Sequence, residues 1–223
     1  DREAQYPISI DPLVTTPVAA DGMSSYGGFG YHAQSFPFSD HPSLVELNGV
    51  VFFEGYDAET GCELWKSDGT EAGTVLVKDL WPGVYSDHAE PIEYGSYSSA
   101  AFSSYPSHLT VYNGRVYFVA RVDQTTTLWT TDGSPENTHI VCPAESGGPQ
   151  GVDELAVSGG QLFLAGWDGG QSRLWKTDGS NTSLVKDINP GAYYSNISSM
   201  VVVGESIYFS AKNLPEELIS EAN

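Results

Sequence analysis

The chain has 223 residues, of which 40% are hydrophobic and 12% aromatic, so it has enough apolar side chains to build a packed core. Its 29 acidic and 9 basic residues give a formal net charge of −20. A surface this acidic repels nucleic-acid phosphates and anionic lipid headgroups, and no run of about 18 apolar residues predicts membrane insertion, so nucleic acid and membranes are excluded as expected partners.

Residues 1–40 form an N-terminal extension that lies outside the pattern found in the rest of the chain. Within it, Tyr6–Val18 is apolar and rich in residues that favour strands. Its prolines restrict such a strand to the edge of a sheet. We therefore predict an edge strand here that pairs with a sheet built elsewhere in the sequence.

The first unit, residues 41–83, is predicted to be a four-stranded antiparallel meander. Two apolar runs flank Asn48-Gly49, a strong hairpin signal because both central residues of such a turn need positive φ. A Leu-Trp strand, an Asp-Gly-Thr turn and a closing strand follow. In order, the predicted strands are Leu44–Leu47, Val50–Glu54, the segment around Glu63-Leu64-Trp65, and Thr74–Leu80.

The same order recurs in three further units, which start after an insertion at residues 84–104 that is rich in Tyr, Ser and Ala. These units span residues 105–148, 152–191 and 197–223. Their hairpin turns are Asn113-Gly114, Gly159-Gly160 and Gly204-Glu205. Repeats of this size predict an all-β, propeller-like array of four-stranded blades. An open β-solenoid or an array of sandwiches is the alternative.

The last unit is shorter than the others. Glu217-Leu218-Ile219 stands where the first unit has Glu63-Leu64-Trp65, and no Asp-Gly-Thr turn or fourth strand follows before Asn223. Pro215–Ala222 has only weak helical periodicity. An unfinished sheet leaves an open edge, so we expect the N-terminal strand of the same or a neighbouring chain to complete it.

The motifs of the first and third units resemble those of the ELWxxDGT repeat family. The first unit reads Glu63-Leu64-Trp65-Lys66-Ser67-Asp68-Gly69-Thr70, and the third ends Leu184-Val185-Lys186-Asp187-Ile188. The second departs, with Pro135-Glu136-Asn137 in its turn. The resemblance implies propeller-like modules of secreted or surface proteins, mostly without assigned activity. It supplies no catalytic residue.

The repeated Asp and Trp residues allow a structural and a chemical interpretation. Asp68, Asp132 and Asp178 are candidate metal ligands, but acceptance of hydrogen bonds from their own turns is favoured. The Trp65, Trp129 and Trp175 side chains are candidates for a sugar platform, but packing between repeats is favoured. The histidines show no metal-ligand spacing. We therefore predict no metal, no cofactor and no enzymatic activity.

Loops rich in Ser, Thr, Tyr and Gly, together with two sequons, point to an exported protein, and the chain has two cysteines. Cys62 starts a third strand and Cys142 ends a fourth strand of the next unit, so a disulfide between neighbouring units is predicted, with two separate thiols as the alternative. Asn181 and Asn196 open N-glycosylation sequons. A chain that begins at Asp1 also fits removal of a secretory signal. Secretion, with an extracellular or cell-surface location, is the expectation.

Aromatic residues concentrate in the segments that link one unit to the next. Tyr beside Ser and Gly is typical of recognition surfaces, although such loops also pack on themselves. We therefore expect a non-enzymatic structural or adhesive module that binds copies of itself or other extracellular proteins, as in a filament or surface assembly. A glycan-binding, lectin-like propeller is the alternative. The candidate interaction residues are Tyr26, Phe29, Tyr31, Tyr85, Tyr94, Tyr97, Tyr193 and Tyr194.

Overall fold

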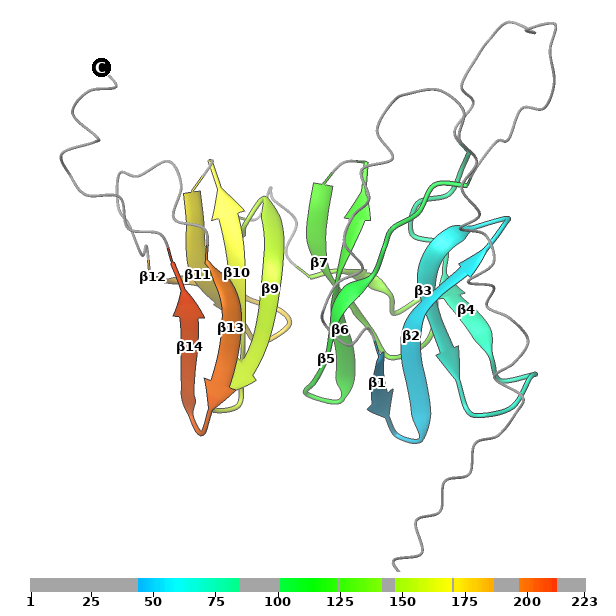
Figure 1. The fold of residues 1–223 in the computed structure, drawn as a ribbon, viewed down its shortest axis with the longest axis horizontal. Coiled ribbons are helices and arrows are strands. Elements are labelled where there is room, and N and C mark those ends of the chain that lie inside the picture. Colours follow the sequence, from blue (N-terminus) through cyan, green and yellow to red (C-terminus); the bar gives the residue numbers. More distant parts are fainter. Residues whose placement is uncertain are drawn as a thin grey trace, which may run out of the picture.

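A computed structural model of the chain describes residues 44–84, 101–123, 125–141, 147–169, 171–186 and 197–211. Every regular element of these segments is a β-strand, and the strands form four antiparallel sheets (Figure 1). The predicted all-β class is therefore confirmed. The predicted edge strand Tyr6–Val18 and the weak helical segment Pro215–Ala222 lie outside the described residues.

The first two sheets are complete four-stranded meanders, with strands in chain order. Sheet 1 consists of β1 (Leu44–Leu47), β2 (Val50–Asp57), β3 (Gly61–Ser67) and β4 (Val75–Lys78). Sheet 2 consists of β5 (Ser107–Tyr112), β6 (Arg115–Val122), β7 (Thr125–Thr131) and β8 (His139–Ile140). Beyond the short strand β8, the Val141 N–H still donates to the carbonyl of Leu128 at 2.9 Å.

Sheet 3 repeats the same meander, and the described part of sheet 4 is its first hairpin. Sheet 3 consists of β9 (Gly151–Ser158), β10 (Gln161–Asp168), β11 (Gln171–Thr177) and β12 (Thr182–Lys186). Sheet 4 consists of β13 (Ser198–Val203) and β14 (Ser206–Ser210). The order of strands predicted for each unit is confirmed as far as the described residues extend.

The hairpin turns explain why these segments fold locally as they do. Asn48 and Gly49 have φ of 55° and 81°, and Asn113 and Gly114 have 49° and 71°. Positive φ at both central positions matches the twist of the flanking strands, and Asn and Gly tolerate it better than other residues. These turns fix the register, so Leu47 pairs with Val50 and Tyr112 pairs with Arg115.

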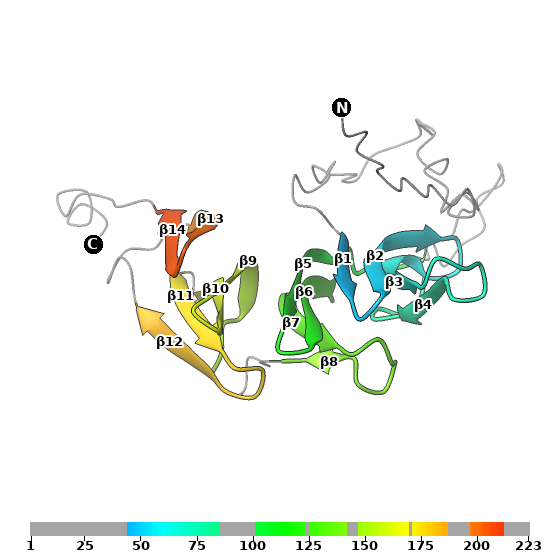
Figure 2. The same cartoon turned by 90° about the horizontal axis from the view of Figure 1, so that it is seen from below.

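The core of the molecule lies between successive sheets. One cluster of buried residues joins sheets 1 and 2, a second joins sheets 2 and 3, and a third joins sheets 3 and 4. The first strands of successive sheets lie in contact, β1 with β5, β5 with β9 and β9 with β13. Figures 1 and 2 show the sheets following one another, with sheets 1 and 4 at opposite ends.

Each sheet has two faces that serve different neighbours. We call the face toward the following sheet the front face, and the face toward the preceding sheet the rear face. Leu64 and Leu128 belong to the clusters with the following sheet, whereas Trp129 and Trp175 belong to the clusters with the preceding one. Because adjacent residues of a strand point to opposite faces, the Leu-Trp pairs of the second and third units each contribute to two different interfaces.

Candidate functional site: the repeated turns and the two end faces

In all three described copies of the Asp-Gly-Thr/Ser turn, the Asp carboxylate accepts a hydrogen bond from the backbone N–H two residues further on. In the first copy, the carboxylate of Asp68 accepts from the Thr70 N–H at 2.9 Å and from its hydroxyl at 2.6 Å. In the third, Asp178 accepts from the N–H groups of Ser180 and Asn181 at 2.8 and 2.7 Å. These are the hydrogen bonds expected of an aspartate that stabilises its own turn.

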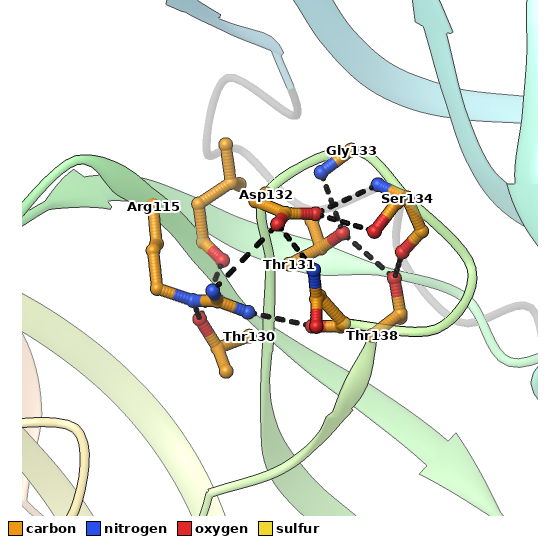
Figure 3. Close-up of polar contacts among 9 residues, drawn as sticks. Arg115, Thr130, Thr131, Asp132, Gly133, Ser134 and Thr138 are labelled. Atoms are coloured by element: carbon orange, nitrogen blue, oxygen red, sulfur yellow. Dashed lines mark hydrogen bonds and ion pairs between the residues drawn. The ribbon is translucent and has the colours of Figure 1, made fainter.

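Figure 3 shows the side-chain network around the second copy of the turn. Asp132 accepts from the N–H and hydroxyl of Ser134 at 2.9 and 2.7 Å, and Arg115 lies 4.0 Å from its carboxylate. Beneath it, the buried hydroxyls of Thr131 and Thr138 are 2.7 Å apart. Side chains before the turn (Thr131) and after it (Thr138) therefore hold its two ends together.

These hydrogen bonds lower the pKa of Asp132, with the Ser134 hydroxyl as the largest cause. A carboxyl whose folded pKa is lowered stabilises the fold above its ordinary pKa, and the effect is lost as pH falls through the lowered value. We expect Asp132→Ala to lower the free energy of unfolding by roughly 1 kcal/mol at pH 7. The loss is no larger because solvent screens the exposed carboxylate.

Urea unfolding at pH 7 and pH 3 checks this prediction, since the difference between wild type and Asp132→Ala should shrink at the lower pH. Glu136, which is exposed in the same loop, supplies the control variant Glu136→Ala. An equal loss in both variants would show that the turn does not depend on the Asp132 carboxylate.

The glycines of the second and third turns lie against an aromatic side chain of the preceding sheet. A Cβ placed on Gly133 would lie 3.1 Å from the Phe52 ring, and one placed on Gly179 would collide with the Tyr117 hydroxyl. Lys66 also donates to the carbonyl of Gly133 at 2.7 Å. At Gly69, by contrast, a Cβ would meet no described atom within 4 Å. The first turn is thus open where the other two are filled.

The tryptophans lie in rows that cross the rear faces. In sheet 1, Leu44 pairs with Phe53, Phe53 with Trp65, and Trp65 with Leu76. The corresponding rows are Leu109, Phe118 and Trp129 in sheet 2, and Leu155, Leu164 and Trp175 in sheet 3, all within the clusters between sheets.

A small residue of the second strand makes room for each indole, a feature that the sequence analysis missed. Gly55 lies under Trp65, where an added Cβ would be 2.5 Å from the ring, and the indole N–H of Trp175 donates to the carbonyl of Gly166 at 3.3 Å. Ala120 occupies the matching position of β6 in the cluster that holds Trp129. The sequence does carry a sign of this feature, because Gly or Ala recurs six residues after the hairpin turn in each of the first three units.

The rear face of sheet 1 is more open than its counterparts. Leu44 is 58% exposed, whereas the corresponding Leu109 of sheet 2 is 6% exposed. Trp65 and Phe53 are half-buried, whereas Trp129 and Phe118 are buried. Sheet 1 therefore presents an apolar row that the other sheets bury.

The front face of sheet 4 has the same property. Val201 and Tyr208 form a cross-strand pair and are 55% and 61% exposed. The corresponding pair of sheet 1 is Val45 and Phe52, and Phe52 is only 2% exposed. We call the rear face of sheet 1 (Leu44, Phe53, Trp65, Leu76) and the front face of sheet 4 (Val201, Val203, Tyr208) the two end faces.

A buried carboxyl lies at the junction of sheets 1 and 2. Glu63 is fully buried and accepts three hydrogen bonds, from the Ser104 hydroxyl at 2.6 Å, the Ser104 N–H at 3.0 Å and the Leu80 N–H at 3.2 Å. Burial is the main cause that raises its pKa to about 7. The group ties the end of β4 to the segment that enters sheet 2.

Cys62, one member of the predicted disulfide with Cys142, is a free thiol in the structure, and the disulfide itself stays a prediction. The segment before β5 occupies the position beside Cys62: the Cys62 N–H donates to the Ser103 hydroxyl, and the Ser104 N–H donates to the Cys62 carbonyl, both at 3.0 Å. Burial, followed by the charge of Glu54, raises the pKa of this thiol to about 11, so it is a poor nucleophile. Cys142 itself lies outside the described residues.

Many of the other predicted residues lie outside the described residues. These are Asn196 and the candidate interaction residues Tyr26, Phe29, Tyr31, Tyr85, Tyr94, Tyr97, Tyr193 and Tyr194. Asn181 is exposed beside the third turn. The described ends of the insertion at 84–104 meet in a bridge between Val84 and Ala101, and Trp81 stacks on Phe102 with ring centroids 4.8 Å apart.

In the part of the chain that the structure describes, no three His, Cys, Asp or Glu side chains gather as a metal site requires. Nor does that part contain a helix with the length and apolar character needed to cross a membrane.

Comparisons with protein-family models, with curated proteins and with solved structures found no match.

Proposed function

We propose that this chain is a non-enzymatic structural or adhesive module that associates with copies of itself outside the cell. Its sheets are taken as blades of a propeller-like array of the ELWxxDGT type. The observation that carries the proposal is the repetition at the two end faces of the residues that are buried between the internal sheets.

Burial of apolar surface supplies the driving force for such association. At about 25 cal/mol per Å² of apolar surface removed from water, covering Leu44, Val201 and Tyr208 would favour a complex substantially. Exposed apolar patches of this kind mark interaction sites in soluble proteins. The edge of β14 supports the same proposal, because among the described strands β14 pairs only with β13 and leaves its other edge open to strand addition.

Residues 1–40 fit this proposal as the donor of the added strand. Tyr6–Val18 would pair with β14 of a neighbouring molecule, and sheet 1 would follow it in the chain. The strand added to β14 and the contact between the end faces would then lie next to each other in the same interface between two molecules.

Salt dependence tests the proposal. Copies that each carry a net charge of −20 repel one another, and the end faces contribute apolar rather than charged contacts. Screening becomes effective over about 10 Å at 0.1 M salt, so self-association should strengthen as salt rises from about 0.02 M to about 0.3 M. Sedimentation velocity over a concentration series measures this. A chain that stays monomeric throughout, or whose complexes dissociate as salt rises, contradicts the proposal.

One observation favours glycan binding as a second candidate. Tyr56 and Trp167 occupy corresponding positions near the ends of β2 and β10, and they are 42% and 39% exposed. Exposed aromatic rings at matching positions suit stacking on sugar rings. A glycan array compared between wild type and Trp167→Ala tests this candidate, and an array without specific signal removes it.

A further inference from the structure

The internal contacts indicate how one end face would meet the other. At two of the three described contacts between successive sheets, 1–2 and 2–3, an aromatic residue of the preceding sheet's second strand lies against the turn glycine of the next sheet. Phe52 does so at Gly133, and Tyr117 does so at Gly179. Both aromatics are the third residue after a hairpin turn and are 2% exposed.

Sheets 4 and 1 each contain one residue of this kind that lacks its partner: an aromatic residue in sheet 4 and a turn glycine in sheet 1. Tyr208 is the third residue after the turn Gly204-Glu205, which is the position of Phe52 and Tyr117, yet it is 61% exposed. Gly69 is the corresponding turn glycine of sheet 1, and its Cβ direction is open. Tyr208 and Gly69 belong to sheets 4 and 1, which lie at opposite ends of the arrangement in Figure 2.

We infer that the front face of sheet 4 packs on the rear face of sheet 1 of a second copy, with Tyr208 against the Gly69 turn. This inference rests on the proposed self-association and specifies its register. The Val201–Tyr208 pair then covers the row formed by Leu44, Phe53 and Trp65, as Val45 and Phe52 cover Leu109, Phe118 and Trp129 inside the chain.

A second copy is the occupant that the structure favours. The interface continues the packing already present between sheets of this chain, and sheets 1 and 4 of one molecule lie at opposite ends in both views (Figures 1 and 2). Front and rear faces differ, so the contact is head-to-tail. Such contacts produce open chains or closed rings of subunits rather than two-fold dimers.

Two measurements test this register. The variant Tyr208→Asp should weaken self-association at least about tenfold, because an aromatic anchor at the centre of an interface is replaced by a charge. Tyr56→Asp makes the same change at a tyrosine that is 42% exposed and outside both end faces, and it should leave association unchanged. Circular dichroism of both variants verifies that they fold.

Cross-linking identifies the two contact positions. Thr70→Cys and Tyr208→Cys are made separately in a chain in which Cys62 and Cys142 are replaced by Ser. Serine occupies the position of Thr70 in the other two turns, so cysteine is tolerated there. When the two variants are mixed with a short bismaleimide, a cross-linked dimer should form that contains one copy of each variant.

The outcomes separate this register from the proposed function. If Tyr208→Asp associates as strongly as wild type and the mixed cysteine variants give no cross-linked dimer, the register is overturned and the proposed self-association stands. A chain that carries both Thr70→Cys and Tyr208→Cys is treated in parallel. Cross-links that form within this double variant but never between the mixed single variants would show closure within one chain and would overturn the second copy as occupant. A wild-type chain that is monomeric at every concentration would contradict the proposed function itself.

Discussion

Phe118→Ala should lower the free energy of unfolding by about 4 kcal/mol, as large-to-small substitutions do in well-packed cores. Phe118 is 0% exposed and lies in the row between Leu109 and Trp129 that joins sheet 2 to sheet 1. Removing its ring leaves a cavity whose walls belong to two different sheets. Urea unfolding followed by tryptophan fluorescence measures the loss.

The repeat supplies a matched control at the same position of sheet 1. Phe53 pairs with Trp65 as Phe118 pairs with Trp129, but it lies on the half-buried rear face. Phe53→Ala should therefore cost about half as much, roughly 2 kcal/mol. Equal losses in the two variants would mean that the rear face of sheet 1 is covered as fully as the internal interfaces.

The buried carboxyl of Glu63 should make the fold less stable as pH rises. Its pKa is about 7 in the folded chain against an ordinary value of 4.5, so between these values the folded state binds more protons than the unfolded state. Stability is then lost as pH rises from about 4.5 to about 7, and this group contributes about 3 kcal/mol to the loss. Above pH 7 its contribution stays constant.

Glu63→Gln isolates this contribution from that of the other acids. Glu54, Asp79 and Asp153 also have raised pKa values, because burial disfavours their charged forms, so the wild-type slope is a sum. Glutamine keeps the shape but does not titrate. Unfolding free energies at pH 5, 6, 7 and 8 should show a slope that is clearly flatter in Glu63→Gln, and parallel curves would exclude a buried titrating Glu63.

Much of the local structure could be predicted from the sequence because it depends on neighbouring residues. Asn48-Gly49 and Asn113-Gly114 specify tight turns through their tolerance of positive φ, and alternation of side chains sets the strands that flank them. The Asp-Gly-Thr motif likewise contains both the donors and the acceptor of its own turn. Such features need no distant partner.

The surroundings of Cys62 could not be predicted from the local sequence. Cys62 begins a third strand as predicted, but the segment that enters sheet 2 lies against it, with Ser103 and Ser104 bonded to its backbone. The path of that segment depends on how two sheets pack. The spacing of the two cysteines in the sequence contains no information about that path.

By itself, then, the sequence determined the strands, their turns and the repetition of one meander, because these follow from backbone preferences and side-chain alternation within short segments. Only the tertiary structure decided that Trp129 and Trp175 face the preceding sheet while Leu64 and Leu128 face the following one. It also decided that Glu63 is buried and that Tyr208 is exposed. These properties depend on which surfaces meet between sheets, and such contacts join residues far apart in the chain.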